Sequence, residues 1–159
     1  MAVDMFLKLE GIKGESKDAK HKDEIHIESF SWGLTQTGAF GTGGGGGAGK
    51  VNVHDITIHK FFDKSSPALM LHCANGKHIT KGLLTVRKAG EHPLEYFKVT
   101  LTDLIVSSIQ HSGGHSDQLT ENLSLNFAKF KVEYQEQNAD GTGKPGGEMG
   151  WDVKANEKA

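Results

Sequence analysis

The sequence predicts a mostly β protein, an antiparallel β-barrel of two curved sheets with one short flanking α-helix. Apolar and polar residues alternate along most of the chain. Glycine is abundant, at 21 of 159 residues against 3 prolines, which favours strands joined by tight turns. The alternation also changes phase repeatedly, and such slips are typical of strongly curved strands. The length suits a single domain over 1–159 with one core.

The first strands are indicated by short alternating stretches. A strand at 5–9 opens the chain, and a polar turn follows over 11–23. The alternation at 25–27 is out of phase with that at 30–32, so we place a bulge near 28–29.

Later strands show two further phase changes. One separates 51–53 from 56–58, and the other separates 123–127 from 130–134. The remaining strands are indicated, in chain order, at 79–88, 94–109 and 151–153.

A single short helix is predicted over 66–76. Ser66 is a suitable N-cap, Pro67 suits the first helical position and Gly76 suits the end. The buried stripe of this helix is expected to consist of Met70, Cys73 and Ala74. Two glycine-rich polar segments, 38–49 and 135–150, are expected to be flexible loops.

The first of these loops carries the candidate functional residues. They are Gly43, Gly44, Gly45, Gly46, Gly47, Ala48, Gly49 and Lys50. Part of this run has the spacing of a phosphate-binding loop, but Val51 has no hydroxyl for Mg²⁺ and a strand follows where a helix is required. We interpret the run as a loop that becomes ordered against a neighbouring subunit, in an inter-subunit or inter-ring contact.

Composition excludes several classes of function. The formal charge is -2 and no basic cluster occurs, so we expect no nucleic-acid partner. Charges within 1–8 argue against a signal peptide, and the lack of a long apolar run argues against direct membrane insertion. Cys73 has no second cysteine to pair with, so we expect the fold to form in a reducing cytoplasm.

We also expect no enzyme activity, no metal site and no cofactor. His54 and His59 would lie on opposite faces of a strand, and His111 and His115 flank a glycine turn. No Gly-x-Ser-x-Gly nucleophile motif occurs, and Cys73 lies within the predicted helix, where a cysteine is usually inert packing.

Nine ordered segments together resemble the haemolysin-coregulated (Hcp) family over essentially the whole length. They are MAVDMFLK at 1–8, GESKD at 14–18, SWG at 31–33, GGGGG at 43–47, GKVNV at 49–53, KFFDKSSP at 60–67, LTVRKAG at 84–90, VSS at 106–108 and LTENLSLNF at 119–127. The resemblance implies a barrel protomer that forms homo-hexameric rings, which stack into the inner tube of the type VI secretion system. It also implies a spike protein, sheath and baseplate components and small effector cargo as partners.

The same resemblance implies synthesis in the bacterial cytoplasm and secretion by the type VI machinery, to the extracellular space or a target cell. No toxin extension is expected after 151–153. Two alternatives stay open. One is a ring that does not stack and acts as an effector chaperone or adaptor, and the other is a small secreted effector.

Overall fold

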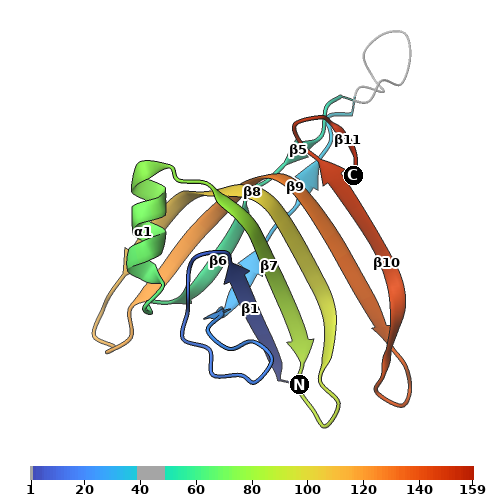
Figure 1. Ribbon diagram of the computed structural model, residues 1–159, viewed down its shortest axis with the longest axis horizontal. Helices are drawn as coiled ribbons and strands as arrows, with labels where there is room; N and C mark the ends of the chain where they lie inside the picture. Colours follow the sequence, from blue (N-terminus) through green and yellow to red (C-terminus); the bar gives the residue numbers. More distant parts are fainter. Residues whose placement is uncertain (1, 39–48) are drawn as a thin grey trace.

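A computed structural model describes residues 2–38 and 49–159, which form mostly antiparallel β-structure with one short helix (Figure 1). The helix is α1 (Ser66–Asn75). The strands are β1 (Val3–Leu9), β2 (Ile25–His26), β3 (Ser29–Ser31), β4 (Leu34–Thr35), β5 (Asn52–Val53), β6 (Ile56–Phe61), β7 (Ile79–Lys88), β8 (Leu94–Ser112), β9 (Thr120–Gln137), β10 (Gly143–Asp152) and β11 (Glu157–Lys158). Within the same residues, no helix is both long and apolar enough to span a membrane.

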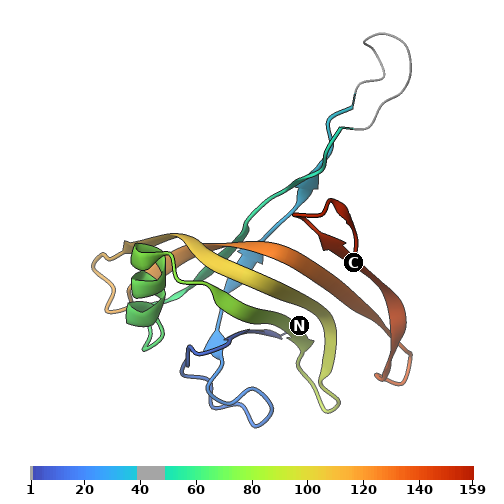
Figure 2. The same ribbon diagram turned by 45° about the horizontal axis from the view of Figure 1, so that its top comes forward.

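One strongly curved sheet forms the wall of the molecule (Figure 2). Its order is β11-β10-β9-β8-β7-β1-β2, with β6 paired to β9 and β3 paired to β6. The seam lies between β2 and β3, where the chain changes partner. The amide of Ile27 donates to the Met5 carbonyl at 3.1 Å, and that of Glu28 donates to the His59 carbonyl at 2.8 Å. The phase change predicted near 28–29 is present, but it is a transfer of the chain from β1 to β6 and not the predicted bulge.

The core is enclosed by this curved wall. Its most buried side chains come from alternate positions of the strands and from α1, and include Leu7, Ile25, Ile56, Ile58, Leu69, Leu101, Leu104, Leu123 and Leu125. The predicted phase change in β9 is confirmed, because Phe127 and Phe130 are both buried although three positions apart. At this point the carbonyl of Ala128 accepts from Val153, and Asp103 on β8 has a positive φ of 52°.

Helix α1 begins and ends nearly where the sequence predicts, but it buries a different face. Ser65 is the N-cap, and Gly76 at the C-cap has a left-handed φ of 66°. Leu69 is fully buried, whereas Met70 is 43% exposed and Ala74 is also exposed. The predicted stripe is wrong except for the half-buried Cys73, because the first turn packs against the sheet and places Leu69 and Cys73 on the inner face.

The segment 135–150 is a β-hairpin, so the predicted loop is wrong there. Strand β9 continues to Gln137, and β10 returns beside it after a turn at 138–142. Its glycines allow close packing against neighbouring strands: a Cβ on Gly143 would lie 2.5 Å from Leu94 Cδ1 of β8, and one on Gly146 would lie 2.6 Å from Tyr134 Cδ2 of β9. These glycines are packing sites in a strand, not markers of a loop.

Candidate functional site: a projecting arm and two polar networks

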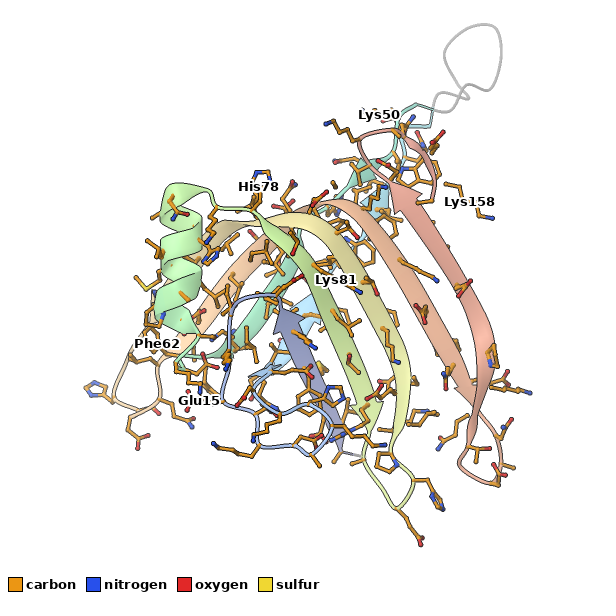
Figure 3. All side chains as sticks on the ribbon, viewed as in Figure 1. Glu15, Lys50, Phe62, His78, Lys81 and Lys158 are labelled. Atoms are coloured by element: carbon orange, nitrogen blue, oxygen red, sulfur yellow. The ribbon has the colours of Figure 1, made fainter. Side chains whose placement is uncertain are left out.

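A two-stranded arm leaves the curved sheet at one end of the molecule (Figures 1 and 2). Strands β4 and β5 pair with each other, Leu34 opposite Val53 and Thr35 opposite Asn52. Of the predicted assembly residues, Gly49 and Lys50 lie on this arm and are exposed. Gly43, Gly44, Gly45, Gly46, Gly47 and Ala48 lie outside the described residues. Lys50 and Phe62 occupy opposite ends of the molecule (Figure 3).

Trp32 holds the first strand of the arm where it leaves the sheet. Its indole Nε1 donates to the His54 carbonyl at 2.8 Å, which ties the two strands of the arm together. Its ring packs edge-on against Phe130, with ring centroids 4.8 Å apart, and against Phe127 at 5.9 Å. The base of the arm is therefore continuous with the core. Leu34, two residues further along the arm, is 45% exposed.

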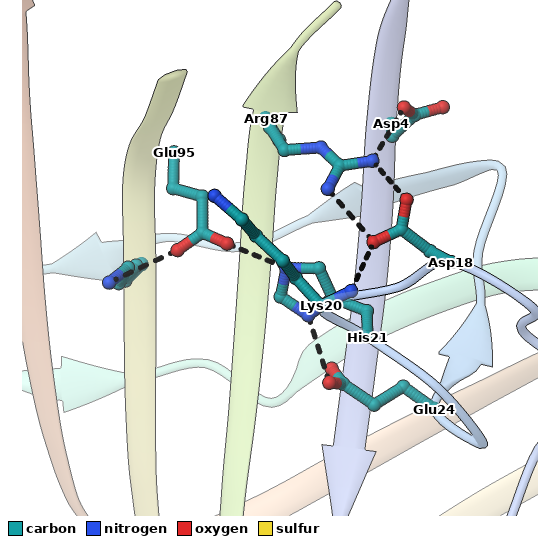
Figure 4. A network of polar contacts seen from close by, with 8 residues as sticks. Asp4, Asp18, Lys20, His21, Glu24, Arg87 and Glu95 are labelled. Carbon is teal, nitrogen blue, oxygen red and sulfur yellow. Dashed lines mark hydrogen bonds and ion pairs between the residues drawn. The ribbon is translucent and has the colours of Figure 1, made fainter. Parts of the chain in front are cut away.

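Arg87 is the centre of a first polar network (Figure 4). Its two terminal nitrogens donate to both carboxylate oxygens of Asp18, at 3.0 and 2.7 Å, and one also donates to Asp4 at 3.2 Å. The hydrogen bonds from Arg87 hold the pKa of Asp18 well below its usual range, and those to Asp18 raise the pKa of Arg87. The segment 11–23 is thereby fastened to β1 and β7.

His21 extends this network to β8. Its ring stacks on Phe6 with centroids 4.3 Å apart, Nδ1 lies 2.8 Å from a Glu24 oxygen, and Nε2 lies 2.6 Å from a Glu95 oxygen. Burial would raise the pKa of Glu95, but the hydrogen bond to His21 and the Lys98 ammonium at 3.2 Å outweigh it, so that the pKa is lowered. The polar groups of this network bind one another, which suits a structural role in holding the segment 11–23 on the sheet.

Lys60 is the centre of a second network, at the start of α1. The Lys60 side chain is fully buried, with Nζ 3.0 Å from Asp63 Oδ1, 3.2 Å from Ser66 Oγ and 3.4 Å from Glu121 Oε1. Glu121 is also fully buried, and its other oxygen lies 3.2 Å from His111 Nε2. The network joins β6 and the first turn of α1 to the end of the β8–β9 hairpin.

Neither network is among the residues predicted from the sequence, although the sequence contains a signal for the second. Lys60 continues the buried phase of Ile56 and Ile58, and Glu121 has the phase of Leu123. A charged side chain at a buried position of a strand requires a partner of opposite charge. The pattern therefore indicates that Lys60 and Glu121 each have a buried, oppositely charged neighbour. His21 lies in a polar turn without periodicity, and no such signal marks it.

His54 and His59, which were considered above as possible metal ligands, make separate local contacts. His59 Nδ1 lies 2.8 Å from Asn122 Oδ1, and His54 Nε2 lies 3.3 Å from Thr35 Oγ1. Across residues 2–38 and 49–159, no group of three or more His, Cys, Asp or Glu side chains is placed to hold a metal ion.

Comparison with known proteins identifies the family. The family model described as "Type VI secretion system effector, Hcp" matches residues 6–134. The chain belongs to the Hcp family. A curated Hcp relative, protein hcp1 of Pseudomonas aeruginosa, is 51% identical over 163 residues, which cover 100% of both chains.

Solved Hcp structures share the fold. Hcp1 from Salmonella typhimurium is 39% identical with a TM-score of 0.80, covering 99% of this chain and 100% of that one. A structure described as a type six secretion system protein has a TM-score of 0.93 at 28% identity, with coverage of 99% and 100%. A type VI secretion system effector from Yersinia pestis is 32% identical with a TM-score of 0.77, covering 94% and 100%.

The segments that resemble the Hcp family meet at the two networks. Asp4, Asp18 and Arg87 come from three different segments and form one cluster. The segment 60–67 likewise meets the segment 119–127 through Lys60 and Glu121. Much of the Hcp sequence pattern therefore fixes loops and the helix onto the sheet.

Proposed function

We propose that this Hcp family chain is the protomer of a hexameric ring, and that the rings stack into the inner tube of the type VI secretion system and carry small effectors. The role is structural, without catalysis or a cofactor. The projecting β4–β5 arm carries the proposal, because an isolated two-stranded ribbon is marginal on its own and gains partners only from another subunit. We propose the run Gly43 to Lys50 as the docking end of that arm.

Two unlike surfaces at opposite ends suit closure into a ring. At one end, Phe61, Phe62 and Leu119 are exposed and line a shallow depression beside α1. At the other, the side of β10 away from β9 is paired, within the described residues, only at Trp151 and Asp152. A heterologous contact between identical subunits uses two different surfaces, and a ring covers strand edges that would otherwise promote aggregation.

The proposed partners follow from the family. A stacked tube requires a spike protein at its end and a sheath and baseplate around it, and its lumen would hold small effectors. Synthesis in the cytoplasm and secretion through the type VI machinery belong to the same proposal, and it includes no nucleic-acid partner and no membrane insertion.

The first experiment measures the absolute mass of the purified protein by light scattering after size exclusion. A species near six times the 17.2 kDa chain mass supports the ring. Electron microscopy of the same sample then distinguishes tubes from discrete rings. Rings that never stack would favour the chaperone or adaptor alternative, and a strict monomer at high concentration would contradict the ring and favour the effector alternative.

The second experiment shortens the arm. Replacing residues 36–51 by an Asn-Gly turn closes the β4–β5 pair with a two-residue hairpin. The fold should be retained, because none of the replaced residues that the structure describes is buried. Stacking of rings should be lost. Unchanged tube formation, with an unchanged circular dichroism spectrum and unfolding midpoint, would contradict a docking role for the arm.

A further inference from the structure

We propose that Asp55 is a positioning residue that sets the direction in which the arm leaves the curved sheet. The inference deepens the proposed function, on which the use of the arm for docking rests. The direction of the arm is a property of the chain itself and is tested separately.

The strand register changes where the arm begins. Ser31 pairs with Thr57 at the end of the β3–β6 ladder, and Leu34 pairs with Val53 at the start of the arm. Between these pairs the first strand advances three positions and the second advances four, so one extra residue lies on the side of His54 and Asp55. A bulge of this kind bends a strand and strengthens its twist.

Asp55 also marks the end of the ladder with β9. The last backbone pair is Ile56 with Leu125, and the next position on each strand is Asp55 and Asn126. Here the side chains replace the backbone ladder: Asn126 Nδ2 donates to Asp55 Oδ1 at 2.8 Å. The arm therefore separates from the sheet at a side-chain clamp.

A second bulge supplies the other half of the clamp. The β8–β9 register shifts between Val106 and Ser108, which leaves Ser107 without a pair. The Ser107 hydroxyl donates to Asp55 Oδ2 at 2.6 Å. Ser124 Oγ lies 2.7 Å from Ser107 Oγ and 2.6 Å from Ser108 Oγ, so the hydroxyl that reaches Asp55 is itself held. Both carboxylate oxygens of Asp55 are thus bound, one to β9 and one to β8.

Both strands of the arm are attached at their base, and Val53 on the second strand also packs against the core. Trp32 anchors the first strand in the core through Phe127 and Phe130, and Asp55 anchors the second strand to β8 and β9. Two anchors on different strands fix both the tilt and the rotation of a ribbon, whereas one anchor permits rotation. Asp55 is half-buried at the surface, so its removal leaves the buried core of Ile56 and its neighbours in place.

The test measures the arm direction by electron paramagnetic resonance distances. Spin labels are attached at Lys50→Cys on the arm and Lys81→Cys on β7 in a Cys73→Ser background, with excess unlabelled protein so that each assembly carries one labelled chain. The parent should give a single narrow distance peak. Asp55→Ala should broaden and shift this peak, and Ser107→Ala should do so in part. The exchange Asp55→Asn with Asn126→Asp should restore the narrow peak, because the amide then donates to the carboxylate across the same pair.

The matched control is Asp117→Ala, the same chemical change on the β8–β9 turn at the far end of the molecule, which should leave the peak unchanged. An Asp55→Ala peak with the parent's width and mean would overturn the inference, and so would a broad peak in the parent. If the parent forms no tubes, the proposed function fails while the distance measurement still decides the role of Asp55. If both hold, Asp55→Ala should form rings that stack poorly and the exchange variant should stack again.

Discussion

At the scale of single residues, the bidentate contact between Arg87 and Asp18 makes a prediction about pH. Because the pKa of Asp18 is lowered in the folded state, its contribution to stability is full above the unfolded value of about 3.9 and is lost as pH falls through the folded value. Arg87→Met removes the cause of that lowering. Its urea midpoint should be below that of the parent at pH 7, and the difference should narrow as pH falls below about 4.

Lys144→Met is the control for this measurement. Lys144 faces Glu136 at 3.7 Å, with both side chains more than half exposed, so the pair adds little to stability. The parent and this control should give similar midpoints at every pH. A difference between the parent and Arg87→Met that is constant from pH 7 to pH 3 would show that the arginine acts through packing on Phe6, which it covers at 5.1 Å, and not through charge.

The buried pair of Lys60 and Glu121 makes a second prediction at this scale. Lys60→Met leaves Glu121 buried without its ammonium partner and should lower the free energy of unfolding by about 3–5 kcal/mol. The double change Lys60→Met with Glu121→Leu should recover part of that loss, because neither charge then stays buried alone. Chemical denaturation of the three proteins checks this. A double variant less stable than Lys60→Met alone would contradict it.

Residue roles were predictable from sequence only where burial has a period. Lys60 and Glu121 occupy buried positions in the alternation of their strands, so their burial could be predicted from the sequence. Asp55 is different, because its role depends on two bulges and on β8, which lies 52 positions away at Ser107. The contact between Arg87 and Asp18 spans 69 positions, and nothing in a polar turn indicates its partner.

At the scale of elements, helix α1 gives a matched pair of neighbouring residues. Leu69 is fully buried against the core, and Met70 beside it is 43% exposed. Leu69→Ala should lower the free energy of unfolding by about 2–5 kcal/mol, because it leaves a cavity. Met70→Ala should change it by no more than about 0.5 kcal/mol. Thermal or urea unfolding of both variants checks the face assigned to the helix, and equal effects would contradict it.

The strands at 25–31, 52–61 and 123–134 show why phase was a good guide to the fold. Each phase change in the sequence corresponds to a bulge or a change of partner, and in β9 it falls where the partner changes from β6 to β10. The segment 135–150 had no alternation to read. Strand β10 in this segment pairs with β9 through its backbone, and its glycines make room for the side chains of Tyr134 and Leu94. The glycine-rich polar composition of the segment is the same as that of a loop, so composition could not reveal the strand.

At the scale of the whole molecule, the described chain combines a dense core with a ribbon outside it. Strands β8 and β9 lie at the centre of the sheet, and β9 pairs with β6, β8 and β10. Among the described residues, the arm is held to the sheet at its base, where Trp32, Val53 and Asp55 make their contacts. Local stability therefore falls from β8–β9 to the arm. An assembly that binds the arm would stabilise the part of the described chain that is least protected against local unfolding.

This gradient predicts the pattern of amide hydrogen exchange. In the unassembled chain, amides of β8 from Val99 to Thr102 should exchange slowest, since these residues pair with both β7 and β9 and lie beside buried side chains. Amides at Leu34, Thr35 and Asn52 should exchange fastest among the strand residues, because an exposed two-residue ladder opens readily.

Stacking of rings should then slow exchange in the arm and leave β8 unchanged. Mass spectrometry of exchange in rings and in tubes measures both effects in one sample series. Protection that appears throughout the curved sheet on stacking would mean that the protomer completes its fold only in the tube. Protection confined to the arm would mean that the curved sheet is fully folded in the free protomer, and that subunit contacts order only the arm.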